Sequence, residues 1–155
     1  MKFIHCLVIA ICFSLLAGLR VSAQQTNPKY DKKLADSLKA DAYGMKSYSL
    51  VILKTGTNTT ESKAVSDSLF KGHLQNIGKL AKQGKLVVAG PMKKNDKNYR
   101  GIFILNSASI DEARALLNTD PAIQHKLLDV EIYGWYGSAA LPMYLPYHEK
   151  VEKNR

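Results

Sequence analysis

LFKGHLQNIGKLAKQGKLVVAGP, at residues 69–91, is the most informative stretch of the chain. Its apolar residues recur at spacings of three and four, which predicts an amphipathic helix with one buried face. Gly84 fits the end of that helix, because glycine adopts the left-handed cap conformation without steric cost. The apolar residues 86–89 then predict a short buried strand, which a Gly-Pro pair ends. One titratable side chain, His73, lies in the apolar face near the predicted start of the helix.

Three further strands and a second helix are predicted outside this stretch. Segments rich in branched and aromatic residues predict strands at 47–54, 100–106 and 130–136. A capping box, with Ser109 as the cap and Glu112 three residues later, opens the second helix. The order strand, helix, strand, strand, helix, strand predicts an α+β, ferredoxin-like βαββαβ fold with an antiparallel four-stranded sheet.

Two of the predicted strands are apolar on both faces. Residues 50–53 are apolar in succession, and residues 102–105 follow the same pattern. Because two helices cover only one face of a four-stranded sheet, the other face needs a partner. We therefore expect a homodimer in which the two sheets pack face to face.

Residues 1–23 have the features of a signal peptide. Lys2 gives a short basic start, residues 3–19 are almost entirely apolar, and small residues precede a cleavage site at about Ala23. We expect export to the periplasm or the medium, without stable membrane insertion after cleavage. A retained membrane anchor is the alternative.

Cysteine and histidine usage limits the chemistry of the mature chain. Cys6 and Cys12 both lie in the leader, which excludes disulfides, thiol catalysis and cysteine-ligated metals after cleavage. His73, His125 and His148 are dispersed and lack metal-ligand spacing. No phosphate-binding glycine motif or nucleophile elbow is present in the sequence. We therefore expect neither a metal nor a cofactor.

The chain is basic, with 22 Lys and Arg against 13 Asp and Glu and a formal net charge of +9. Loss of Lys2 and Arg20 with the leader would leave +7. The basic residues are scattered and are not interleaved with aromatic residues as in a nucleic-acid module, so we expect no nucleic-acid partner. Solvated surfaces explain most of them. An attraction for anionic ligands remains open.

The mature chain divides into three predicted parts. Residues 24–45 form an N-terminal arm, in which Asn27 and Pro28 fit the start of a helix, with partial disorder as the alternative. Residues 46–137 form the domain. Residues 138–155 form an irregular C-terminal tail.

Several short pieces of the chain occur in the order and spacing of a known family. The matching pieces are residues 72–74, 84–86 and 89–92, Gly101, and Asp120 with Pro121. Over residues 47–137 the chain resembles the YCII-related (YciI-like) family of small ferredoxin-like proteins. The resemblance implies a dimeric α/β barrel, like that of muconolactone isomerases, and a candidate active site of one histidine and one aspartate. These are His73 and Asp120 here. Relatives include a dehydrochlorinase that acts on a chlorinated hydroxymuconate.

His73 and Asp120 suit acid–base chemistry if they meet at one end of the sheet. A neutral imidazole can take or give a proton, and a carboxylate on its other nitrogen sets the tautomer. Each residue also has a purely structural interpretation. A histidine in an apolar stripe is commonly a satisfied core residue, and Asp120 is well placed to cap a short helix that starts at Pro121.

Four further residues are candidates for binding a substrate. Arg100 lies at a strand start, where it would hold an anionic group, although a solvated arginine is the simpler interpretation. Gly90 and Pro91 belong to the matching family pieces. Trp135 shares a strand face with Tyr133 and would line a pocket, with core or interface packing as the alternative.

Two functions remain from the sequence. The first is a small exported enzyme that uses His73 and Asp120 for proton transfer, in an elimination or isomerisation of a small organic substrate, for which an anionic one is an option. The second is a non-catalytic, dimeric module that binds a small ligand or serves as an accessory protein.

Overall fold

The computed structural model describes residues 27–153, so the predicted signal peptide lies outside the described part. The chain divides into two units, residues 1–31 and 32–155. In the first unit, Asn27 begins a turn, because its carbonyl oxygen accepts from the Tyr30 amide at 3.0 Å. The sequence predicted a helix that starts here, and the arm does contain a helix, but that helix begins at Lys32. Asn27 Oδ1 accepts from the Lys29 amide and closes a tight turn instead.

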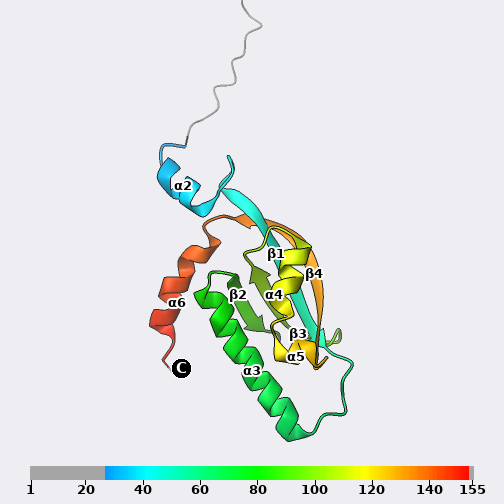
Figure 1. The fold of residues 1–155 in the computed structure, drawn as a ribbon. Helices are drawn as coiled ribbons and strands as arrows, with labels where there is room; N and C mark the ends of the chain where they lie inside the picture. Colours follow the sequence, from blue (N-terminus) through cyan, green and yellow to red (C-terminus); the bar gives the residue numbers. More distant parts are fainter. Residues whose placement is uncertain (1–26, 154–155) are drawn as a thin grey trace, which may run out of the picture. The chain divides into compact units, whose positions relative to one another are not determined.

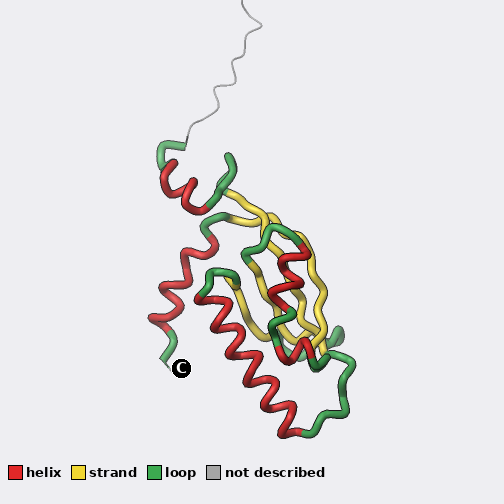
Figure 2. Tube along the Cα trace, viewed as in Figure 1, coloured by secondary structure: helices red, strands yellow, loops and turns green. Residues whose placement is uncertain are grey.

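The second unit has the strand and helix order that the sequence predicted, with extra helices at both ends (Figures 1 and 2). Its elements are α2 (Lys32–Leu38), β1 (Met45–Thr55), α3 (Lys63–Lys82), β2 (Leu86–Pro91), β3 (Tyr99–Leu105), α4 (Ile110–Leu117), α5 (Pro121–Gln124), β4 (Leu128–Ser138), the 3₁₀ helix η2 (Leu141–Tyr144) and α6 (Leu145–Val151). The sheet order is β2-β3-β1-β4, with every neighbouring pair antiparallel. This is the ferredoxin-like α+β fold.

Helix α3 is longer than the sequence predicted. Ser62 caps it by accepting a hydrogen bond from the Val65 amide at 3.3 Å, so the helix begins at Lys63. The first turns are mostly polar and solvent-facing, so they lack the apolar stripe that revealed the rest of the helix. His73 therefore lies near the middle of α3, not near its start. Gly84 follows the helix with φ of +66°, as predicted for its cap.

Helices α3, α4 and α5 lie on one face of the sheet (Figure 1). The core forms between them and the inward residues of the strands. Its buried members are Val51, Leu53, Leu80, Leu86, Phe103, Leu105, Ala113, Leu117, Ala122, Ile123 and Leu128. Because burial of each large apolar side chain contributes about 1.5–3 kcal/mol, this layer holds the helices on the sheet.

The other side of the sheet carries an apolar patch, which we call the open face. Cross-strand neighbours share a face, and here Leu50 lies opposite Ile104 and Ile52 opposite Ile102. All four are only half-buried. Tyr133, opposite Leu50 on β4, is 51% exposed. Two-sided apolar strands are thus present in the fold, as the sequence indicated.

The C-terminal segment is helical, whereas the sequence predicted an irregular tail over residues 138–155. Pro142 and Pro146 led to that error, but they lie in the first turns of η2 and α6. Proline is tolerated there because the first amides of a helix have no intrahelical acceptor. The Tyr144 hydroxyl donates to the Val87 carbonyl on the edge strand β2. No helix of residues 27–153 is long and apolar enough to cross a membrane.

Candidate active site

His73 and Asp120 meet at the end of the helical layer. His73 Nδ1 lies 2.6 Å from Asp120 Oδ2, and the two side chains are 11% and 1% exposed. Asp120 reaches this place as the N-cap of α5. Its other oxygen, Oδ1, accepts from the backbone amides of Ala122 at 2.9 Å and Ile123 at 3.4 Å. Asp120 therefore makes both contacts that the sequence suggested: one oxygen caps α5, and the other pairs with His73.

A close approach of α3 to α5 brings the pair together. A Cβ atom on Gly72 would lie 2.6 Å from Cγ of Pro121. Since real Cβ atoms do not approach so closely, only glycine beside His73 lets the helix come this near. The Gly-His and Asp-Pro dipeptides thus form one contact, although 47 residues separate His73 from Asp120.

The carboxylate sets the tautomer of the imidazole. An ionised carboxylate accepts only, so Nδ1 carries the hydrogen and donates it to Oδ2. No buried side-chain nitrogen or oxygen in residues 27–153 lacks a hydrogen-bond partner. Because Nδ1 is the ring nitrogen of His73 with a partner, Nε2 is open to the adjacent cavity. Nε2 is the atom that can accept a proton from a ligand.

Two aromatic rings hold the imidazole in position. The Phe103 ring is stacked on it at 5.9 Å with an interplanar angle of 21°. The Phe70 ring meets it edge-on at 6.2 Å and 87°. The hydrogen bond and these two contacts leave little freedom for the ring to turn.

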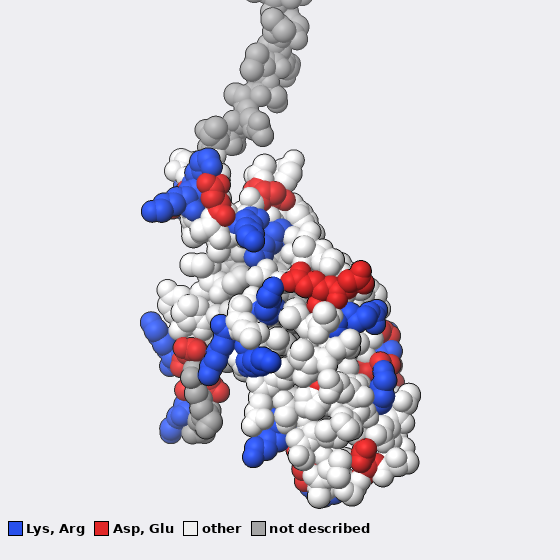
Figure 3. Space-filling model, in the orientation of Figure 1, with Lys and Arg blue, Asp and Glu red and all other residues white. Residues whose placement is uncertain are grey.

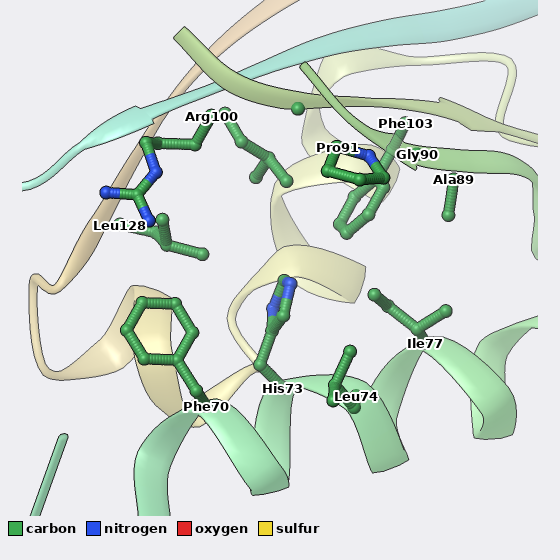
Figure 4. Close-up of a pocket in the computed structure, with 12 residues that line it drawn as sticks. Phe70, His73, Leu74, Ile77, Ala89, Gly90, Pro91, Arg100, Phe103 and Leu128 are labelled. Carbon is green, nitrogen blue, oxygen red and sulfur yellow. The ribbon is translucent and has the colours of Figure 1, made fainter. Parts of the chain in front are cut away.

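A cavity of about 380 Å³ opens between α3 and the strands β2 and β3, with His73 on its wall (Figure 4). Its side chains are apolar apart from His73 and Arg100. The lining residues are Leu53, Phe70, His73, Leu74, Ile77, Ala89, Gly90, Pro91, Arg100, Gly101, Phe103 and Leu128. A compact organic molecule fits a space of this size and character.

Arg100 brings a positive charge to the cavity. Its side chain lies over Leu128 on the same side as Phe70 (Figure 4). Arg100 is exposed, and its guanidinium makes neither an ion pair nor a hydrogen bond within the described part of the chain. An anionic group entering the cavity would therefore find an unpaired cation.

Gly90 and Pro91 also line the cavity, at the end of β2. A Cβ atom on the neighbouring Gly101 would lie 2.7 Å from the Gly90 carbonyl oxygen, so glycine is required where β2 and β3 meet the cavity. The structure thus brings together five of the six predicted site residues.

Trp135 is the exception. It does not line this cavity, and it packs against Tyr48 with ring centroids 5.6 Å apart. Register explains the difference. Trp135 lies opposite Tyr48 on the open face, whereas His73 approaches the other face of the sheet. The sequence predicted that Trp135 lines a pocket, and it lines a different one, together with Tyr48 and Ser109, while it also packs as the alternative describes.

The apolar wall of the cavity was not identified from the sequence. Phe70, Ile77 and Phe103 fit the pattern of core residues, and nothing local distinguishes a core wall from a cavity wall. The remaining histidines lie elsewhere, with His125 at the end of α5 and His148 on α6. Within residues 27–153 no group of three His, Cys, Asp or Glu side chains could hold a metal ion.

Comparisons with known proteins identify the family. The comparison with curated proteins found no match. Among the matching solved structures is 5-chloro-2-hydroxyhydroquinone dehydrochlorinase (TftG) from Burkholderia phenoliruptrix AC1100, in complex with 2,5-dihydroxybenzoquinone. The two chains are 22% identical, and the match covers 56% of this chain and 92% of the dehydrochlorinase chain, with a TM-score of 0.40. The sequence model of the YCII-related domain matches residues 49–136, more than half of the chain. This chain therefore belongs to the YCII-related domain family.

Proposed function

We propose that this protein is an exported enzyme that transfers a proton on a small organic substrate, in an elimination or an isomerisation. The observation that carries the proposal is the 2.6 Å contact of His73 with Asp120 on the wall of an otherwise apolar cavity. The support for export is the leader-like pattern of residues 1–23.

The proton would move through Nε2 of His73. Nε2 takes a proton from a substrate carbon, and the electron pair of that C–H bond remains on the substrate, which becomes a carbanion or enolate. In an isomerisation the imidazolium returns the proton at another carbon. In an elimination the electron pair expels a leaving group from the neighbouring carbon. Asp120 remains ionised throughout and stabilises the imidazolium through Nδ1–H.

The cavity lining favours a compact substrate with an anionic end. Apolar walls exclude water from the reacting atoms, and the hydrogen bond between His73 and Asp120 is stronger in such surroundings. Arg100 would bind a carboxylate or the oxygen that becomes negative as the proton leaves. A volume of about 380 Å³ is at the small end of ligand sites.

A proton-exchange experiment tests this function. Small carbon acids, including cyclic 1,3-diketones, hydroxylated quinones and unsaturated hydroxy acids, are incubated with the protein in D₂O. We expect saturable deuterium incorporation at carbon for at least one of them, followed by proton NMR. Saturable binding without any exchange or elimination would contradict the proposal and would support a non-catalytic binding module.

We also propose that the protein is a homodimer joined through the open face. The support is that Ile102 and its neighbours stay half-buried in one copy, while helices cover the opposite face. A second copy can cover this apolar surface by the same patch, which a two-fold axis requires. Leaving it in water would be unfavourable.

Ile102→Lys is expected to convert the dimer to a monomer, because each subunit would place an unpaired ammonium in the apolar interface. Light scattering after size exclusion measures the mass. Val65→Lys is the matched control, since Val65 is a 42% exposed apolar residue at the start of α3. A wild-type monomer, or an Ile102→Lys protein that remains dimeric, would overturn the proposed interface.

A further inference from the structure

A second cavity, of about 540 Å³, lies apart from the His73 site and shares no lining residue with it. It forms where the end of α2 and the start of β1 meet the segments that follow α3 and β3. Its lining includes the ammonium-bearing Lys39, Lys46 and Lys85, the carboxylate of Glu112, and polar groups of Gly84 and Asn106.

The single carboxylate of this cavity is already engaged. Glu112 Oε1 accepts from Lys85 Nζ at 3.0 Å, and Oε2 accepts from the Ala108 amide at 3.3 Å. Within residues 27–153, Lys39 and Lys46 have neither an ion pair nor a side-chain hydrogen bond that would offset their charge. The cavity therefore holds two positive charges that no protein group neutralises.

Lys39 and Lys46 line the same cavity, and the charge of Lys39 acts on Lys46. Burial lowers the pKa of Lys46, and the positive charge of Lys39 lowers it further. Both effects disfavour the charged form of Lys46, and a bound anion would relieve both. Figure 3 shows basic side chains below α2, whereas the first turn of α4 carries the acidic side chains of Asp111 and Glu112.

The backbone after α2 positions Lys39, and a ring contact positions the Lys46 side chain. Lys39 directly follows α2 with φ of +58°, a conformation unusual for a residue other than glycine. The next amide, of Ala40, donates to the Ala35 carbonyl at 2.9 Å. The Lys46 ammonium lies 5.0 Å from the ring centre of Tyr48. Opposite them, Asn106 Nδ2 donates to the Gly84 carbonyl at 3.1 Å and joins the two segments that complete the wall.

We propose that this second cavity binds a small doubly charged oxyanion, with Lys39 and Lys46 as its two cationic contacts. Two ammonium groups on one cavity match two negative charges on one ligand, as in a phosphate group or a dicarboxylate. Because this cavity shares no lining residue with the His73 cavity, the proposal does not depend on the proposed enzyme activity.

Titration with inorganic phosphate and, separately, with succinate tests the proposal at constant ionic strength. We expect saturable shifts of the backbone amide NMR signals of Lys46, Gly84 and Asn106 with at least one probe. A response to only one of the two probes identifies the oxyanion that the cavity prefers. Lys39→Gln with Lys46→Gln should weaken binding about 10-fold or more, because both charged contacts are lost.

Lys93→Gln with Lys94→Gln is the matched control, because it removes the same charge from an exposed turn outside the cavity. It should change the affinity less than about twofold, since exposed distant charges are screened. Three results would overturn the proposal: no saturable shift with either probe, equal weakening by the two lysine pairs, or shifts confined to His73 and Arg100. Thermal unfolding of each variant verifies that the protein remains folded.

Discussion

Replacing His73 by glutamine should lower the rate of proton transfer by about 10²- to 10⁴-fold, the usual contribution of a positioned general base. Glutamine has a similar length, and its amide can still donate to Asp120 Oδ2. It cannot accept a proton at the position of Nε2. The substitution therefore removes the chemistry and keeps the buried hydrogen bond, so the free energy of unfolding should fall by only about 1 kcal/mol.

The measurement is the exchange rate of whichever carbon acid the wild-type protein turns over, together with thermal unfolding of the variant. His125→Gln is the matched control, because His125 is exposed at the end of α5 and lies outside the cavity. The control should retain full activity. A His73→Gln protein that turns over at the wild-type rate would remove the histidine from the mechanism.

Asp120→Asn should lower turnover by about 10²-fold or more while the helix cap survives. The backbone amides of Ala122 and Ile123 point at Oδ1, so they require an oxygen there. The amide NH₂ of asparagine must then take the place of Oδ2 and face His73. Nδ1 would accept a hydrogen bond instead of donating one, and the proton of the neutral ring would move to Nε2. A ring protonated at Nε2 cannot act as the base.

Nitrogen NMR of the imidazole gives a readout that a purely structural role would not change. The wild-type protein should show the hydrogen on Nδ1, and Asp120→Asn should show it on Nε2. Asparagine caps helices as well as aspartate does, so the cap should be retained. The free energy of unfolding of the variant should fall by about 1–3 kcal/mol, mainly because the charged hydrogen bond is lost. The free energy of unfolding of Asp120→Ala should be about 1 kcal/mol lower than that of Asp120→Asn, since alanine also removes the cap. An unchanged tautomer with unchanged turnover would show that Asp120 only caps α5.

Much of the fold could be predicted because its determinants are local. Apolar periodicity, the Ser109 cap and Gly84 are read within a few residues, and they place the elements in the correct order. The errors also have local causes. The polar first turns of α3 gave no apolar pattern, and the prolines of the C-terminal segment indicated irregular structure although they begin helices.

Site residues were predictable to different degrees. Arg100, Gly90 and Pro91, which the sequence suggested as substrate-binding residues, line the cavity. Trp135 lines a pocket other than the His73 cavity, and alternation along β4 could not separate the two, because it tells which residues share a face but not which face the helices cover. The cavity exists because α3 does not completely fill the space above β2 and β3. No pattern of neighbouring residues in the sequence predicts how completely a helix fills such a space.

The amino-acid sequence by itself determined the ferredoxin-like order of elements, a histidine within an apolar helix face, and an Asp-Pro dipeptide suited to cap a helix. These follow from backbone sterics and from burial over a few residues. Only the tertiary structure decided that His73 and Asp120 touch and that Nε2 opens onto a cavity. The physical reason is packing, because the contact of Gly72 with Pro121 sets the distance between two helices that are far apart in the chain.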